Sequence, residues 1–243
     1  PDLKLLGPLE PTPIGPPAED CLSFRGGTPS ELLIKNAHVL DPGAGVDGRL
    51  DVLVRNGVIA EIAEGLTAPD GVETIDAAGK HLFPGFVDPH VHLRTPGFEY
   101  KEDLETGSRA AAQGGFTAIV AMANTRPPID SVGAIQSLRT RAEQDAHVPI
   151  GFSATVTRGM QGKALSEMGE LAEAGAICFT DDGLPIANAG LMRQALQYQR
   201  LAGRQIALHE EDPQLTRGGA MNEGALSARL GLAGYPPVSE STM

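Results

Sequence analysis

The feature that most constrains the fold is an alternation of apolar runs and amphipathic stretches that begins near Pro84. Five apolar runs predict strands, at 83–93, 116–124, 148–157, 176–182 and 204–210. Each is followed by a stretch of helical character, at 102–115, 132–145, 164–175, 190–203 and 223–234. Nearly continuous apolar strands that alternate with helices of this length are typical of a parallel sheet. The pattern therefore predicts the α/β class.

Five such units fit either an open doubly wound sheet or part of a (β/α)8 TIM-type barrel. Polar residues follow several successive strands, and active sites of barrels lie at the carboxyl ends of their strands. We therefore predict a barrel. Because a barrel needs eight units, we expect that the sequence is incomplete at its C-terminal end.

Two regions precede the predicted partial barrel at 84–243. Residues 1–30 hold seven prolines and four glycines without periodicity, which predicts an extended, disordered segment. Residues 31–83 contain short β-like runs separated by turn signals such as Asn56-Gly57, which predict a small β domain.

The composition excludes several classes of partner. A net charge of -12 and a pI near 4.9 argue against a nucleic-acid groove or an anionic membrane surface, since both need a basic patch. The two cysteines, Cys21 and Cys178, are too few for a disulfide framework. No apolar stretch approaches the roughly 18 residues of a membrane span, and no signal peptide is evident. We expect a cytoplasmic protein with a small-molecule substrate.

Two histidines close the first predicted strand. Side chains alternate along a strand, so His90, His92 and Arg94 are predicted to share one face. Two imidazoles at i and i+2 can hold one divalent ion. Without context, two solvated histidines are the commoner outcome. Their position at a strand's carboxyl end, where barrel enzymes place their sites, favours metal ligands.

Later strands end in polar residues as well. Asn124 follows the second strand, Asp181 and Asp182 the fourth, and His209 the fifth. Each has a structural explanation, since Asn124 can form a turn, the aspartates can cap a helix, and His209 can be a half-buried histidine. Together with the histidine pair they form a ligand set suited to a two-metal site.

At this point the sequence resembles a known family. The stretch "FPGFVDPHVHLRTPGFEYKEDLETGSRAAAQGGFTAIVAMANTRPPID" looks like the first two units of bacterial dihydroorotase, a member of the amidohydrolase superfamily of metal-dependent (β/α)8 barrels. The resemblance extends from about Glu31 to the end of the sequence. It implies that residues 31–83 are half of a composite β-sandwich.

The resemblance also implies roles for individual residues. The implied metal ligands are His90, His92, Asp182 and His209, with Asp181 as the rival to Asp182 as the bridging ligand, and the implied substrate-binding residues are His92, Arg94 and Asn124. Two zinc ions, bridged by a hydroxide and by Asp182, are implied as the cofactor. A further zinc histidine and the general acid/base aspartate would lie beyond Met243, so we expect this chain to be inactive alone.

The implied reaction is the reversible cyclisation of N-carbamoyl-L-aspartate to dihydroorotate, with loss of water, in pyrimidine biosynthesis. A homodimer and a complex with aspartate carbamoyltransferase are the macromolecular assemblies that the resemblance suggests. The nearest alternative is another cyclic amidohydrolase, namely a hydantoinase, dihydropyrimidinase or allantoinase. These lack the pair Arg94 and Asn124. A non-catalytic scaffold subunit is a second alternative, and the retained metal-ligand set argues against it.

Overall fold

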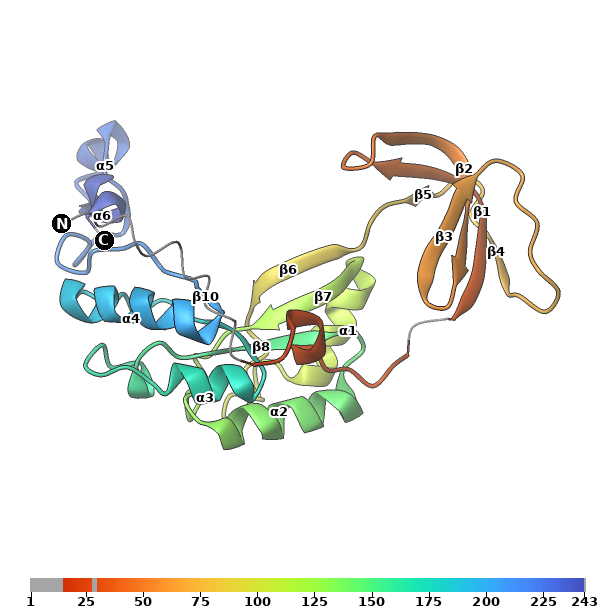
Figure 1. The fold of residues 1–243 in the computed structure, drawn as a ribbon. Helices are drawn as coiled ribbons and strands as arrows, with labels where there is room; N and C mark the ends of the chain where they lie inside the picture. The colour runs from red at the N-terminus through yellow and green to blue at the C-terminus, as the bar shows by residue number, and fades with distance from the viewer. Residues whose placement is uncertain (1–14, 28–29, 243) are drawn as a thin grey trace, which may run out of the picture. The chain divides into compact units, whose positions relative to one another are not determined.

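The computed structural model describes residues 15–27 and 30–242. The chain divides into two compact units. One comprises Gly26–Phe86 and is called the β unit below, and the other comprises Pro1–Arg25 together with Val87–Met243 and is called the barrel unit. Figure 1 shows the elements of both.

The β unit is a five-stranded sheet. Its strands are β1 (Glu31–Asp41), β2 (Val46–Arg55), β3 (Val58–Ala63), β4 (Thr74–Asp76) and β5 (His81–Leu82). The order is β3-β2-β1-β4, and β5 also pairs with β1. Asn56 and Gly57 connect β2 to β3 with φ of 52° and 75°, the left-handed values that a type I′ hairpin turn needs. The turn signal in the sequence thus lies at a real hairpin.

The barrel unit contains the strands of the predicted sheet. They are β6 (Phe86–Val91), β7 (Phe116–Ala121), β8 (Ile150–Ala154), β9 (Ala176–Phe179) and β10 (Gln205–Ile206). Their order in the sheet is β10-β9-β8-β7-β6, and the pairs from β7 to β10 are parallel. All five residues of β8 are buried, as a central strand of a covered parallel sheet requires.

Helices alternate with these strands as the sequence predicts. They are α1 (Leu104–Gln113), α2 (Val132–Asp145), α3 (Met168–Glu173), α4 (Ala189–Ala202), α5 (Ala225–Leu230) and α6 (Val238–Ser241). Each of α1 to α4 contacts the sheet, α1 on β7, α2 on β8, α3 on β9 and α4 on β10 (Figure 1). A two-residue strand pair, β11 (Met221–Asn222) with β12 (Gly234–Tyr235), follows β10.

Local sequence explains where the long helices begin. Asp103 caps α1 by accepting a hydrogen bond from the backbone N–H of Thr106 at 2.8 Å, and Ser131 and Asn188 cap α2 and α4 in the same way. The inner faces of the helices meet the strands in one apolar core. This core includes Ile119, Ile135, Phe152, Leu171 and Phe179. It fixes the carboxyl ends of the strands relative to one another.

The segment before the β unit differs from the expectation for residues 1–30. Residues 1–14 and 28–29 lie outside the described residues, but 15–27 include a short 3-10 helix, η2 (Ala18–Cys21). Ser23 and Ile150 exchange two backbone hydrogen bonds of 3.0 Å, and Cys21 is fully buried. This part of the segment therefore packs against the amino end of β8 and is not an extended chain in solvent. Proline content gave no sign of these long-range contacts.

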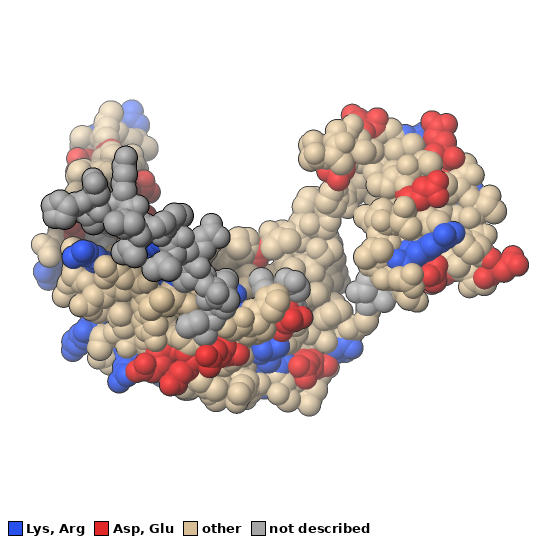
Figure 2. Space-filling view, viewed as in Figure 1, with Lys and Arg blue, Asp and Glu red and all other residues tan. Residues whose placement is uncertain are grey.

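Acidic side chains are exposed on both units (Figure 2). On the face drawn in Figure 2, acidic side chains gather over α3, which carries Glu170 and Glu173. Among residues 15–27 and 30–242, no helix combines the length and the apolar character that crossing a membrane would require.

Candidate metal centre

The first predicted ligands lie where β6 ends. His90 is in the strand, which stops at Val91, and His92 is the first residue after it. The backbone N–H of His90 donates to Asp88 Oδ1 at 3.0 Å, which ties the residue to its own strand. Arg94 has a left-handed φ of 60°. Side chains alternate between faces only in extended backbone. Strand alternation therefore does not place Arg94 on the face of the two histidines.

His90, His92 and Asp182 form a cluster at the carboxyl edge of the sheet. One ligand atom from each lies within 4.8 Å of the other two. Asp182 Oδ1 is 3.1 Å from Nε2 of His90 and 3.9 Å from Nε2 of His92. His90 and His92 lie at the end of β6 and Asp182 lies after β9, and the order of β6 to β9 in one sheet brings them together. Two imidazole nitrogens and a carboxylate oxygen are a donor set that suits zinc.

Asn124 joins two members of this cluster. Its Nδ2 donates a hydrogen bond to Asp182 Oδ2, and its Oδ1 lies 3.0 Å from Nδ1 of His92. Because an amide oxygen only accepts, Nδ1 of His92 is the protonated nitrogen. In the neutral imidazole, Nε2 then carries the free lone pair and faces Asp182, which is the tautomer that a metal-binding histidine needs. Asn124 thus orients both a histidine and a carboxylate.

The two adjacent aspartates have opposite environments. Asp181 is 4% exposed and points away from the histidines, with Oδ1 accepting from the backbone N–H groups of Val156 and Thr157 at 2.8 and 3.0 Å. Burial raises its pKa, and the hydrogen bonds from Thr157 and Val156 oppose that shift. Asp182 is the aspartate that faces the histidines. Strand alternation could not decide between them, because β9 ends at Phe179, before either residue.

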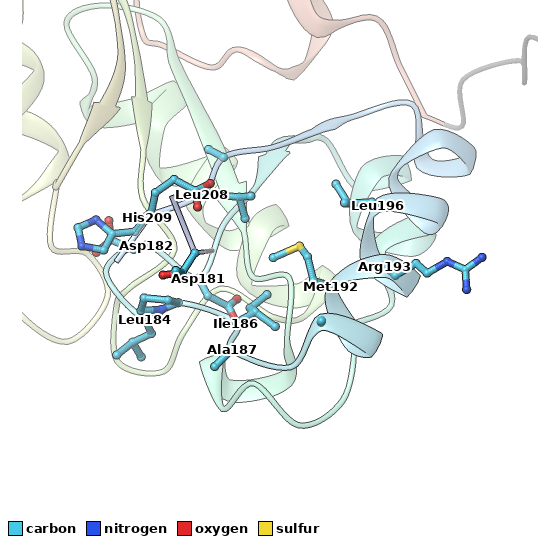
Figure 3. Close-up of a pocket in the computed structure, with 15 residues that line it drawn as sticks. Asp181, Asp182, Leu184, Ile186, Ala187, Met192, Arg193, Leu196, Leu208 and His209 are labelled. Carbon is cyan, nitrogen blue, oxygen red and sulfur yellow. The ribbon is translucent and has the colours of Figure 1, made fainter. Parts of the chain in front are cut away.

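His209 lies outside the cluster but lines the same cavity as Asp182. A cavity of about 350 Å³ is bounded on one side by Asp181, Asp182 and His209 (Figure 3). Its remaining wall is mainly apolar, with Leu184, Ile186, Met192, Leu196 and Leu208 among the lining residues. Arg193, Glu210 and Thr242 add polar groups to this wall. The His209 imidazole is about half exposed, and its Nε2 lies 2.9 Å from Glu211 Oε2, a hydrogen bond that lowers the pKa of Glu211. Within the described part of the chain, His209 is thus not one of the three clustered ligands.

A second cavity opens on the other side of Asn124 and Asp182. Its volume is about 460 Å³, and Arg126 and Phe98 line it together with Asn124 and Asp182. The guanidinium of Arg126 lies over the Phe98 ring, 5.7 Å from the ring centroid. Arg94 is half-buried, and none of the described residues hydrogen bonds to its guanidinium or forms an ion pair with it.

Sequence reasoning did not identify Thr157 or Arg126 as part of this region. Thr157 follows β8 at its carboxyl end and donates its hydroxyl to Asp181 Oδ2. The general rule that polar residues after barrel strands deserve attention would have found it, since "SATVT" ends the third predicted strand. Arg126 precedes two prolines, and nothing in its local sequence indicates that it stacks on Phe98.

Comparison with known proteins agrees with this geometry. A family model described as dihydro-orotase-like matches residues 79–243. The curated dihydroorotase of Citrifermentans bemidjiense is 48% identical over 209 residues, which cover 86% of this chain and 49% of that protein. The dihydroorotase of Pelobacter propionicus is 50% identical over the same shares. The chain therefore spans about half the length of the curated relatives it matches.

Several solved structures with a similar fold are hydantoinases. The L-hydantoinase (dihydropyrimidinase) of Arthrobacter aurescens aligns with a TM-score of 0.69 at 24% identity, over 88% of this chain and 49% of that chain. The D-hydantoinase (dihydropyrimidinase) of a Thermus species aligns with a TM-score of 0.61 at 32% identity, over 76% and 41%. These likenesses and the parallel sheet confirm the prediction of an amidohydrolase-type barrel architecture with a β region before it.

Proposed function

The chain belongs to the dihydroorotase-like family, and on that basis we propose that it carries the metal-binding and substrate-binding part of a dihydroorotase. The reaction would be the reversible cyclisation of N-carbamoyl-L-aspartate to dihydroorotate. The observation that carries the proposal is the cluster of His90, His92 and Asp182 at the carboxyl edge of the sheet. One ligand atom of each side chain lies within 4.8 Å of the other two.

We propose zinc as the metal. His90 Nε2, His92 Nε2 and the Asp182 carboxylate would hold it, and the free lone pair on Nε2 of His92 supports this assignment. A second ion, bridged to the first by Asp182, would use His209, which lines the same cavity as Asp182. When bound, zinc acts as a Lewis acid that polarises a carbonyl group and makes water more acidic.

The chain's own residues would bind and orient the substrate. Arg94 lies two residues after His92 and has no protein partner among the described residues, so its guanidinium can pair with the substrate carboxylate. Asn124 would hold the other side of that carboxylate while it keeps His92 and Asp182 in place. His92 would border the substrate as well as the metal. The positive charge at Arg94 would attract an anionic substrate in spite of the acidic surface.

A hydantoinase or dihydropyrimidinase is the second candidate, because the Thermus D-hydantoinase (dihydropyrimidinase) shares this fold at 32% identity. The carboxylate group of the substrate distinguishes the two functions. Dihydroorotate, the ring that a dihydroorotase would bind, is dihydrouracil with one added carboxylate group, and dihydrouracil is the ring that a dihydropyrimidinase would bind. Arg94, two residues after His92 in the sequence, is the residue that favours the carboxylated ring.

Binding of the two rings to the zinc-loaded chain tests this choice. We expect dihydroorotate to bind roughly 10- to 100-fold more tightly than dihydrouracil in isothermal titration, because a hydrogen-bonded charge pair contributes about 1.5–3 kcal/mol. Arg94→Met should remove that preference, while Arg200→Met, on the exposed side of α4, should keep it. Equal binding of the two rings by the unmodified chain would favour the hydantoinase-type alternative.

The assemblies expected from the family are separate proposals. A homodimer would appear in sedimentation as twice the mass of the chain. A complex with aspartate carbamoyltransferase would appear as co-migration of the two purified proteins, and its absence would leave the proposed reaction unaffected.

A further inference from the structure

Asp181 is a buried carboxylate that the proposed reaction does not use. It is 4% exposed, and its carboxylate accepts three hydrogen bonds from two residues at the carboxyl end of β8. The donors are the backbone N–H of Val156 at 2.8 Å, the backbone N–H of Thr157 at 3.0 Å and the Thr157 hydroxyl. The Thr157 hydroxyl in turn accepts from the backbone N–H of Gly162 at 3.0 Å. The carboxylate therefore joins the end of β9 to the loop after β8.

The next residue, Asp182, has a backbone conformation that needs support. Its φ is 48°, in the left-handed region that residues with a Cβ rarely adopt without local constraints. Its backbone N–H donates to Thr180 Oγ1 at 2.9 Å, and the backbone N–H of Thr180 donates to Ala154 O at 2.8 Å. Asp182 is thus held between Thr180 on one side and Asp181 on the other.

This backbone conformation determines where the Asp182 carboxylate lies. With Asp181 turned toward β8, Asp182 turns toward β6, and its Oδ1 comes to 3.1 Å from His90 Nε2. If the Asp181 anchor were lost, residues 181 and 182 could relax toward ordinary extended backbone. The Asp182 carboxylate would then move away from the histidines.

We infer that Asp181 is a positioning residue for the metal centre, which holds Asp182 in its left-handed conformation by binding the β8 loop. The inference deepens the proposed function and rests on it, because Asp182 matters as a ligand only if the cluster binds a metal. Asp181 itself would touch neither metal nor substrate. A residue that supports a ligand in this way commonly changes metal affinity by about 10- to 100-fold.

Two variants of Asp181 separate positioning from other roles. Asp181→Ala removes all three hydrogen bonds. Asp181→Asn keeps an oxygen for the two backbone donors and an amide group that can donate to the Thr157 hydroxyl. Positioning therefore predicts rescue by asparagine, whereas a metal ligand would lose function in both variants. Asp51→Ala is the matched control, because Asp51 is also 4% exposed and accepts two backbone hydrogen bonds, but in the β unit.

The experiment has a structural readout and a binding readout. Crystal structures of the metal-free chain and its variants report the φ of residue 182 and the distance from Asp182 Oδ1 to His90 Nε2. Titration with Zn²⁺ alone, against a chromogenic chelator, reports affinity. We expect Asp181→Ala to lose the left-handed φ and the short distance and to bind Zn²⁺ at least about 10-fold more weakly. Asp181→Asn and Asp51→Ala should match the unmodified chain in both readouts.

The outcomes distinguish the inference from the proposed function. An Asp181→Ala chain that keeps both the conformation of Asp182 and the Zn²⁺ affinity overturns the inference and leaves the proposed function intact. Equal loss of affinity in Asp181→Ala and Asp181→Asn also overturns it, in favour of Asp181 as a ligand. If the unmodified chain takes up no Zn²⁺ and Asp182 still moves in Asp181→Ala, the proposed function fails and the positioning stands. Should Asp181→Ala not fold, Thr157→Val against Thr157→Ser decides, since only valine should displace Asp182.

Discussion

The two edges of the five-stranded parallel sheet in the barrel unit satisfy their polar groups in different ways. At the carboxyl edge, side chains bind one another, as Asn124 does with Asp182 and His92. At the amino edge, arginines bind backbone carbonyl groups. Arg139 donates to Asp20 O at 2.6 Å and to Ala174 O at 3.2 Å, and Arg204 donates to Ala176 O at 2.8 Å.

We therefore assign metal binding to the carboxyl edge of the sheet and stabilisation of the fold to its amino edge. The arginines hydrogen bond to backbone carbonyl groups at this edge. Gly175 allows this because a side chain there would collide with the Arg139 guanidinium. The carboxyl edge instead keeps imidazole nitrogens and a carboxylate within reach of one another, with residues such as Asp182 in left-handed backbone. Barrel enzymes generally divide the two roles between the two ends of the strands.

We expect the largest effect of a substitution at the carboxyl edge, on the affinity for Zn²⁺. Asp182→Ala should weaken Zn²⁺ binding by more than about 100-fold, because loss of a ligand exceeds the 10- to 100-fold cost of losing a residue that supports one. The folded state should persist, since the Asp182 side chain contacts only site residues. Chelator competition measures the affinity and circular dichroism the fold. Unchanged affinity would mean that the cluster is not the metal site.

The amino edge should show the reverse behaviour. Arg139→Ala should lower the free energy of unfolding of the barrel unit by about 2 kcal/mol, the scale for hydrogen bonds from a charged group. Zn²⁺ affinity should stay unchanged. Urea denaturation gives the stability, and Arg200→Ala on the exposed surface of α4 is the control. A drop in Zn²⁺ affinity as large as the drop in stability would contradict the separation of roles.

A smaller effect on the free energy of unfolding is expected at the N-terminus of α1, and this effect should depend on pH. The hydrogen bond from the Thr106 backbone N–H lowers the pKa of Asp103, so this carboxylate stabilises the folded state above its unfolded pKa of about 4. Asp103→Ala should therefore lower the free energy of unfolding by about 1 kcal/mol at pH 7. The difference from the unmodified chain should shrink as the pH falls through the lowered pKa. Denaturation at pH 7 and pH 3 measures this difference in the free energy of unfolding. Glu143→Ala is the control, because Glu143 is exposed. A difference that grows on acidification would refute this assignment.

The smallest effect on the first metal ion is expected at His209. This imidazole pairs with Glu211 and stands outside the three-ligand cluster. His209→Ala should change the affinity for the first equivalent of Zn²⁺ by less than about threefold, well below the cost of removing a supporting residue, while any second equivalent is lost. Zn²⁺ titration that resolves the two equivalents checks this. Loss of the first equivalent would place His209 in the primary site.

The sequence predicted those parts of the site that depend on strand ends. Apolar runs followed by polar residues predicted His90, His92 and the pair of Asp181 and Asp182 at one edge, because parallel strands bring their carboxyl ends together. The predicted helix at 132–145 coincides with α2, whose capping serine and apolar spacing are local signals.

What the sequence could not predict depends on backbone geometry or long-range contacts. The left-handed residues Arg94 and Asp182 lie where strand alternation no longer applies, so it neither aligned Arg94 with the histidines nor chose between the two aspartates. Packing of residues 15–27 depends on Arg139 and Arg204, which lie more than 100 positions along the chain. No periodicity in the segment itself could indicate those partners.

The most direct test of the account is a crystal of this chain soaked with Zn²⁺ and measured on both sides of the zinc absorption edge. We expect an anomalous peak between Nε2 of His90, Nε2 of His92 and Oδ1 of Asp182, at zinc-to-ligand distances of about 2 Å. A peak only at exposed acidic side chains such as those over α3, with none at the carboxyl edge of the sheet, would contradict it.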